Sequence, residues 1–136
     1  MRIMRGVSAN ITRGIMLGTI LNCADNTGAK KLELIGVRGY KGIKRRNPSA
    51  GVGDIIMCAV KKGDEKMRKH VVYAVIVRQR KEYRRMDGTR VKFEDNAAVL
   101  VNPKTFEPQG TEIRSAVAKE VVERFTPIGK ISSIVV

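Results

Sequence analysis

Apolar residues in this chain occur in short runs, most of which are closed by clusters of Gly, Asp, Asn or Lys. Five runs have the composition of strands: residues 15–22, 29–37, 54–60, 71–77 and 97–101. Strands of this length, separated by turn formers about every ten residues, are typical of a small barrel or sandwich. The pattern therefore predicts a mainly β chain of five or more strands.

Two of these runs indicate how their strands are buried. Leu32 and Leu34 alternate with Lys31, Glu33 and Ile35, a period of two that indicates a strand with one buried face. Residues 71–77 (VVYAVIV) are so rich in β-branched side chains that we expect burial on both faces.

The remaining segments predict a loop, a hairpin and a late helix. Residues 36–53 hold five Gly and one Pro, and we expect a long loop without a packed element. Asp87-Gly88 indicates a hairpin within residues 78–93, because Gly tolerates the positive φ of tight turns. Ser115 is expected to cap a helix from Ala116 to about Phe125, ended by Thr126-Pro127. Residues 131–136 are then a short helix or a strand.

The length of 136 residues suits a single domain, 1–136. Within it we expect an N-terminal extension (about 1–14) and a β-barrel region (15–101). The barrel region carries the basic loop 36–53 and the hairpin 78–93. A C-terminal helical part (102–136) completes the chain.

The charge of the chain is far from balanced. Its 27 Lys and Arg against 13 Asp and Glu give a net charge of +14 at pH 7. Residues 1–92 hold 22 basic and 7 acidic side chains, whereas residues 93–136 hold 5 and 6. A field of this sign attracts a polyanion, most often nucleic acid. An anionic membrane surface and a merely solvated basic face are the alternatives.

Two groups of cations, in the Gly-rich loop and on the hairpin, and the separate pair Lys30 and Lys31 are candidates for phosphate contacts. In the loop Gly lets a backbone approach phosphate, and Arg binds phosphate in bidentate fashion. A third group, within residues 61–69 (Lys61, Lys62, Lys66, Arg68 and Lys69), is diluted by acidic neighbours and is equally well explained as plain surface. The predicted RNA-binding residues are Arg38, Lys41, Lys44, Arg45 and Arg46 in the loop, Arg78, Arg80, Lys81, Arg84, Arg85, Arg90 and Lys92 on the hairpin, and Lys30 and Lys31 at the start of the second strand.

No pattern of catalytic or metal-ligating residues is present. His70 is the single histidine and follows Arg68 and Lys69, which indicates a surface residue or a strand edge. The turn at residues 51–54 (GVGD) leads into a strand-like run and not into a helix, unlike a phosphate-cradling Gly loop. We therefore expect no catalysis, no cofactor and no metal.

Cys23 and Cys58 lie in apolar stretches without C-x-x-C spacing. No signal peptide or 18-residue apolar run is evident, so we expect a cytoplasmic protein with reduced, mostly buried thiols and no contact with a membrane. The number of cysteines permits a disulfide between the two, and this alternative stays open.

The mode of nucleic-acid binding follows from the aromatic content. The chain has three Tyr, three Phe and no Trp, fewer aromatics than proteins that hold single strands by base stacking. Recognition through phosphates, 2′-hydroxyls and shape remains, which suits a large folded RNA. Two alternatives stay open. One is an OB-like single-stranded nucleic-acid-binding protein or RNA chaperone, and the other is a protein-interaction module whose basic face docks an acidic partner.

Six short motifs follow one another along the chain: residues 24–30 (ADNTGAK), 50–54 (AGVGD), 75–78 (VIVR), 84–88 (RRMDG), 93–97 (FEDNA) and 110–113 (GTEI). Together, and in this order, they resemble the universal large-subunit ribosomal protein family numbered fourteen. The resemblance covers about Ile15 to Phe125, and the basic loop, the N-terminal extension and residues 78–81 (RQRK) resemble its archaeal and eukaryotic branch. Residues 114–117 (RSAV) depart from the family, which commonly has a Gly-Pro pair before the Val.

The resemblance implies a small five-stranded β-barrel with a protruding hairpin and a short C-terminal helical part. It implies a structural role in the large ribosomal subunit, bound to large-subunit rRNA and helping to bridge to small-subunit rRNA. It also implies contacts with the large-subunit proteins numbered three and twenty-four-e and with the anti-association factor numbered six. The nearly neutral C-terminal third of the chain is consistent with a protein-facing surface there.

Overall fold

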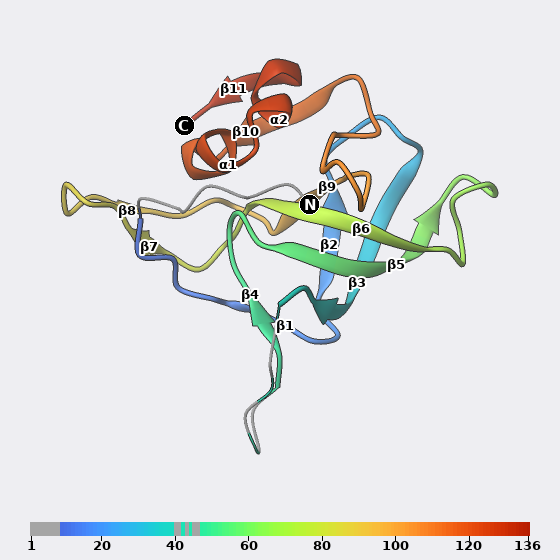
Figure 1. Ribbon diagram of the computed structural model, residues 1–136, viewed down its shortest axis with the longest axis horizontal. Helices are drawn as coiled ribbons and strands as arrows, with labels where there is room; N and C mark the ends of the chain where they lie inside the picture. The colour runs from blue at the N-terminus through green and yellow to red at the C-terminus, as the bar shows by residue number, and fades with distance from the viewer. Residues whose placement is uncertain (1–8, 40–41, 43, 45–46) are drawn as a thin grey trace.

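The computed structural model describes residues 9–39, 42, 44 and 47–136. Five strands close into a barrel in the order β2-β3-β5-β6-β9 (Figure 1). Adjacent strands are antiparallel except β2 and β9, whose short parallel pair closes the barrel. The predicted five-stranded β-barrel is confirmed. Its strands are β2 (Ile20–Cys23), β3 (Ala29–Val37), β5 (Ile55–Gly63), β6 (Val71–Arg78) and β9 (Ala97–Leu100).

The barrel interior follows the apolar pattern of the strands. In β3, Leu32 and Leu34 are buried and Ile35 is exposed, as the period of two predicts. In β6, by contrast, only the second half is buried on both faces, and Val71 at its start is 63% exposed. The first three residues of β6 pair with Met57–Ala59 of β5 but lie before the ladder with β9, which begins at Ala74, and Val71 therefore reaches solvent.

The expectation of one strand over residues 15–22 is wrong. Gly18, at φ +87°, turns the chain and separates β1 (Ile15–Met16) from β2. Strand β1 instead pairs with β4 (Ser49–Ala50), so the end of the segment 36–53 is packed and is not an open loop. A Cβ on Gly51 would lie 2.6 Å from Ile11, which shows how closely the N-terminal segment covers this turn. Strand β5 also runs three residues further than expected, to Gly63.

The motifs at residues 24–30 and 110–113 are hydrogen-bonded to each other at one end of the barrel. The buried carboxylate of Asp25 accepts hydrogen bonds from the Thr27 hydroxyl at 2.7 Å and from the Leu100 backbone N–H at 2.9 Å. The Asn26 side chain donates to the Thr111 hydroxyl at 2.8 Å, and its oxygen accepts from the Thr111 N–H at 3.0 Å. A Cβ on Gly110 would lie 2.7 Å from that Asn26 oxygen, so a larger residue there would displace the Asn26 amide from its hydrogen bonds.

The prediction that a helix begins at Ala116, with Ser115 as its cap, is wrong about where the helix begins. Residues Ile113–Val117 form β10, and α1 spans only Lys119–Arg124. Thr126-Pro127 does end α1, but it also begins α2 (Thr126–Ile131). The strand alternative for the last residues is confirmed by β11 (Ser132–Val135). Strand β11 pairs in parallel with β10, and this pairing draws residues 113–117 into a strand.

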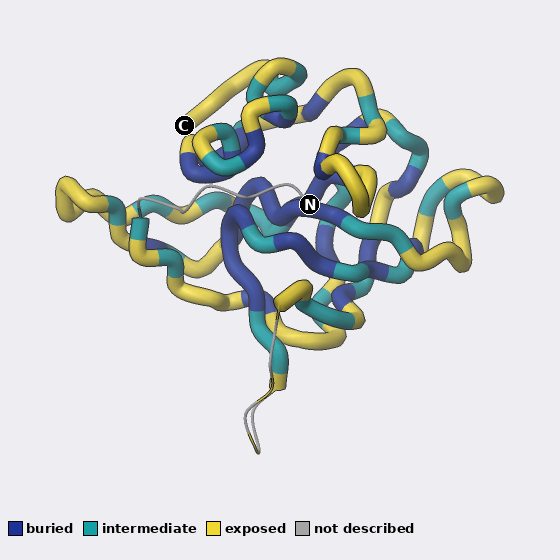
Figure 2. Tube along the Cα trace, in the orientation of Figure 1, coloured by how far each residue is buried: buried dark blue, intermediate teal, exposed yellow. Residues whose placement is uncertain are grey.

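The C-terminal elements form a layer on one side of the barrel (Figure 1). Val121, Phe125 and Ile128 are buried in the same apolar cluster as the barrel strands. Phe106 and Phe125 meet edge to face with ring centroids 6.1 Å apart. Figure 2 shows that the buried backbone follows the barrel, whereas the tips of the hairpin and of the β5–β6 turn are exposed. The exact divisions at residues 14/15 and 101/102 stay predictions.

Across the described ranges, no helix has the length and apolar character needed to cross a bilayer.

Candidate nucleic-acid interface

The hairpin predicted around Asp87-Gly88 is present and projects from one end of the molecule (Figure 1). Its strands are β7 (Tyr83–Arg84) and β8 (Arg90–Val91), in which Arg84 stands directly opposite Arg90. Gly88 has φ +90°, and the Asp87 carboxylate accepts the Thr89 N–H at 2.9 Å, so both motif residues shape the turn. Two like charges opposite each other repel, and a bound anion would relieve that repulsion.

The root of the hairpin is tied to the C-terminal layer by a buried carboxylate. Glu120 of α1 is completely buried and accepts hydrogen bonds from the Tyr83 hydroxyl and from Arg85 Nε, each at 2.7 Å. Arg85 also donates through Nη2 to the backbone carbonyl of Val136 at 2.6 Å. Arg85 is therefore engaged within the protein, although its sequence context is that of a free cation.

Glu120 is held in its charged form. Burial by itself raises its pKa, but the hydrogen bonds from Arg85 and Tyr83 outweigh burial and bring the pKa below its usual value. Burial and the adjacent Glu120 raise the pKa of Tyr83, so its phenol stays protonated and serves as a donor. The ion pair of Arg85 and Glu120 therefore persists wherever the protein is folded at neutral pH.

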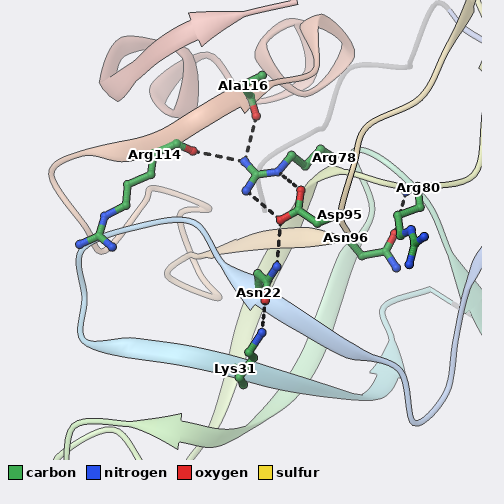
Figure 3. Close-up of polar contacts among 8 residues, drawn as sticks. All are labelled: Asn22, Lys31, Arg78, Arg80, Asp95, Asn96, Arg114 and Ala116. Atoms are coloured by element: carbon green, nitrogen blue, oxygen red, sulfur yellow. Dashed lines mark hydrogen bonds and ion pairs between the residues drawn. The ribbon is translucent and has the colours of Figure 1, made fainter.

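A second internal network holds Arg78 at the end of β6 (Figure 3). Arg78 is only 8% exposed. Its guanidinium donates to the Asp95 carboxylate at 2.6 and 3.1 Å and to the backbone carbonyls of Arg114 and Ala116 at 3.2 and 3.1 Å. Asn22 joins this network by donating to Asp95 at 2.9 Å. Arg78 thus ties the barrel to β10 and does not face solvent.

Removing the carboxylate of Asp95 should destabilise the protein. We expect Asp95→Ala to lower the free energy of unfolding by about 2 kcal/mol, because a charge-assisted hydrogen bond is lost and a nearly buried guanidinium stays behind. Urea unfolding followed by circular dichroism measures the change. Glu94→Ala, at the exposed neighbouring position, is the matched control and should change stability by less than about 0.5 kcal/mol. Equal effects of the two substitutions would contradict the role of Asp95.

Acid should weaken both networks. A hydrogen bond from Arg78 lowers the pKa of Asp95, and hydrogen bonds from Arg85 and Tyr83 lower the pKa of Glu120. Because the unfolded chain binds these protons at higher pH, the stabilisation is fully present above the ordinary carboxyl range and is lost as pH falls through the lowered pKa values. We expect the urea midpoint to fall progressively between about pH 5 and pH 2. A smaller fall in Glu120→Gln than in the parent protein would support the assignment, and an identical fall would contradict it.

The predicted RNA-binding residues divide into three classes in the structure. Arg78 and Arg85 are engaged internally, as described. Lys41, Arg45 and Arg46 lie outside the described residues. The others have exposed side chains: Lys30, Lys31, Arg38, Lys44, Arg80, Lys81, Arg84, Arg90 and Lys92.

These exposed cations do not form one patch. The hairpin projects from one end of the long axis, and the pair β1–β4, which forms the base of the loop, lies on another side of the barrel (Figure 1). Lys31 stands opposite Lys62 of β5, and its ammonium group donates to the Asn22 side chain. The β5–β6 turn lies at the end opposite the hairpin. The structure therefore presents separate basic surfaces that face in different directions.

One positioning residue was missed by sequence reasoning. Gln79 is completely buried although it stands between two arginines. Its side-chain oxygen accepts the Val52 N–H at 2.9 Å, and its nitrogen donates to the carbonyls of Thr12 and Lys81, each at 2.8 Å. Gln79 thus joins the N-terminal segment, the turn 51–54 and the approach to the hairpin. The only signal was an uncharged amide within a run of cations.

The turn at residues 51–54 does not offer its backbone to a phosphate. The N–H groups of Gly51, Val52, Gly53 and Asp54 all donate within the protein, to the Asp54 side chain, Gln79, Ile76 and Gly51 respectively. This agrees with its interpretation as a plain turn.

The aromatic side chains give little support to base stacking. Tyr83 is completely buried, and the ring of Phe106 is nearly buried and lies under Arg38, whose guanidinium is 4.6 Å from the ring centroid. Tyr40 lies outside the described residues. Of the two aromatics in the hairpin segment 78–93, Tyr83 is therefore not available for stacking with a base, and Phe93 is half-buried.

The described thiols and the histidine show no arrangement for catalysis. Cys23 and Cys58 are unpaired, so the disulfide left open by the sequence is not formed. Burial raises the pKa of each thiol to about 12, which leaves both protonated and unreactive. His70 is exposed immediately before β6, as expected. Among the described residues there is no cluster of three or more His, Cys, Asp or Glu that would hold a metal.

Comparison with known proteins agrees with these features. A family model described as Ribosomal protein L14p/L23e matches residues 14–136. Large ribosomal subunit protein uL14 of Methanothrix thermoacetophila is 53% identical over 133 residues, which is 98% of this chain and 100% of the relative. The uL14 proteins of Methanococcus vannielii and Halorubrum lacusprofundi are 52% and 50% identical over 97% and 98% of this chain, and over 99% and 100% of their own lengths.

Proposed function

Because this chain belongs to the L14p/L23e family of ribosomal proteins, and is thus a non-catalytic structural constituent of the large ribosomal subunit, we propose that it holds large-subunit rRNA through its exposed cations. The observation that carries this proposal is the hairpin. Arg84 and Arg90 face each other on an exposed arm, while its root is fixed by the buried Glu120. Such an arm places two repelling charges where an RNA phosphate can neutralise both.

The proposed contacts follow from the exposure of the described cations, and Lys41, Arg45 and Arg46 are kept on the sequence alone. Arg78 and Arg85 serve as positioning residues, because their guanidinium groups are engaged within the protein. The RNA-facing set keeps the other predicted residues: Lys30, Lys31, Arg38, Lys41, Lys44, Arg45, Arg46, Arg80, Lys81, Arg84, Arg90 and Lys92.

The physical mechanism is electrostatic positioning. Each Lys or Arg that contacts a phosphate releases a condensed counterion from the RNA, so affinity depends steeply on salt. A stiff barrel fixes where the cations point, which sets the orientation of the bound RNA without reading its bases. The basic surfaces that face in different directions fit an RNA that surrounds part of the protein and not a single short helix.

The resemblance supports a second, finer proposal about neighbours in the ribosome. We propose that the protein helps to bridge to small-subunit rRNA. We also propose contacts with the large-subunit proteins numbered three and twenty-four-e and with the anti-association factor numbered six. The exposed apolar side chains of Ile134, Val135 and Val136 at the C-terminal layer are consistent with a protein neighbour there.

Salt dependence tests the RNA proposal. With on the order of ten phosphate contacts, the affinity for a large-subunit rRNA fragment should fall with a slope of about −7 to −9 in a plot of log K against log salt concentration. Filter binding at several salt concentrations measures this slope. A slope near zero would overturn the proposal. Nuclease treatment before pull-down separates the protein-docking alternative, since only RNA-dependent partners would then disappear.

A further inference from the structure

A hollow of about 390 Å³ lies apart from the hairpin tip, between three segments that are distant in sequence. One wall is formed by Ala9, Asn10, Ile11 and Arg13 of the N-terminal segment, and another by Val52 and Asp54 of the Gly-rich turn. Arg124, the last residue of α1, closes the third side. The described part of its wall therefore contains two arginines and one carboxylate.

The charges in this hollow are not matched. Asp54 lies 3.7 Å from Arg13 Nε and 3.8 Å from Arg124 Nη1, both longer than a hydrogen bond. One oxygen of Asp54 also accepts the Gly51 N–H at 2.8 Å, which holds the carboxylate against the turn. One carboxylate is thus shared by two guanidinium groups and forms a hydrogen bond with neither, which leaves an excess of one positive charge among the described residues of the wall.

Arg124 also carries a donor without an acceptor. Its Nη1 donates to the carbonyl of Gly53 at 3.2 Å, and its side chain is 22% exposed. Its Nε is buried, and no hydrogen-bond partner for it exists within the described structure. Buried polar groups in folded proteins almost always have a partner, so an unpaired donor in a positively charged hollow indicates a missing acceptor.

We propose that this Arg13–Arg124 hollow, whose lining residue Asn10 pairs with Arg84 of β7, binds one phosphate group of the rRNA backbone through cations other than the facing Arg84 and Arg90 of the hairpin. A phosphate presents several strong acceptor oxygens and matches the fork of donors on a guanidinium. It can bridge Arg13 and Arg124 at once and supply the acceptor that Arg124 Nε lacks. Because neither arginine is hydrogen-bonded to Asp54, little is lost when they turn from that carboxylate to the anion. The assignment of the phosphate to rRNA rests on the proposed function.

Inorganic phosphate is the first probe. In the folded full-length protein, the Nε–Hε NMR signals of Arg13 and Arg124 should shift and saturate with added phosphate but not with chloride at equal ionic strength. Arg13→Gln, at a side chain that is 66% exposed, should weaken this binding about tenfold or more without altering the fold. Arg124→Gln should do the same, and Arg68→Gln on the exposed β5–β6 turn is the control and should have no effect. Absence of saturable shifts would overturn the site, as would a stronger response to an oligoglutamate peptide than to phosphate.

A second experiment tests whether the bound phosphate belongs to RNA. Arg13→Gln should lower the magnitude of the salt slope for rRNA binding by about one, whereas Arg68→Gln should leave it unchanged. Phosphate binding with an unchanged slope would overturn the rRNA assignment. If the unmodified protein did not bind rRNA at all, the proposed function would fall, and the phosphate titration would still decide whether the hollow binds an oxyanion.

Discussion

Replacing Glu120 by alanine is expected to lower the free energy of unfolding by about 3 to 5 kcal/mol, the range typical of breaking a buried ion pair by removing one partner. Glu120 is completely buried, and its loss leaves the guanidinium of Arg85 and the hydroxyl of Tyr83 without their shared acceptor. Urea unfolding followed by circular dichroism measures the loss as a lower midpoint with an unchanged slope.

The matched control for Glu120→Ala is Glu112→Ala, a removal of the same side chain at an exposed position just before β10. We expect a change of less than about 0.5 kcal/mol there. The loss of stability in Glu120→Gln should lie between those of Glu120→Ala and Glu112→Ala. The amide keeps the shape of the side chain and an acceptor for Tyr83, but it does not balance the positive charge of Arg85. A Glu120→Ala protein as stable as the control would show that the hairpin root does not depend on this carboxylate.

Reversing the charge of Arg84 and Arg90 together is expected to weaken rRNA binding by on the order of 100-fold or more. Each lost charge-assisted contact contributes about 1.5 kcal/mol, and two such contacts amount to about two decades in affinity. Both side chains are exposed and lie opposite each other on the hairpin, so one phosphate group or two adjacent ones can meet them. Binding of a large-subunit rRNA fragment at fixed salt measures the loss, and the salt slope should fall in magnitude by about two.

Lys66→Glu with Arg68→Glu is the matched control for this charge reversal. It makes the same change in net charge on the exposed β5–β6 turn, at the opposite end of the molecule. We expect its effect on rRNA binding to be at least tenfold smaller, and both double variants should unfold at the same urea concentration as the parent. Equal losses from the two ends would mean that net charge, and not the hairpin, determines binding.

Arg85 is unsuitable for such an experiment, although it is adjacent to Arg84. An acidic residue at position 85 would face the buried Glu120, and the like charges would disrupt the hairpin root. Loss of binding in such a variant would then report unfolding and not a missing phosphate contact. The tertiary structure thus decides which of two neighbouring arginines can test the interface.

Strand pattern and turn chemistry were the features most accurately predicted from the sequence. Residues 29–37 form a strand with the expected bounds, because the alternation of Leu32 and Leu34 with outward residues is a local property of the backbone. The Asp87-Gly88 hairpin is likewise local, since Gly88 supplies the positive φ that its turn needs. The errors lie where a local pattern allows two structures, as at residues 113–117, which become a strand because β11 pairs with them.

By itself, the order of residues determined that the chain is a mainly β protein with an excess of cations, because both properties are set by neighbouring side chains and by composition. Only the tertiary structure decided what each cation does. Arg78 and Arg85 look like their neighbours in sequence, yet they are held by Asp95 and Glu120, which lie 17 and 35 positions further along the chain. Such partners meet only after the barrel closes and the C-terminal layer packs on it, so no local pattern can distinguish a structural arginine from one that is free to bind RNA.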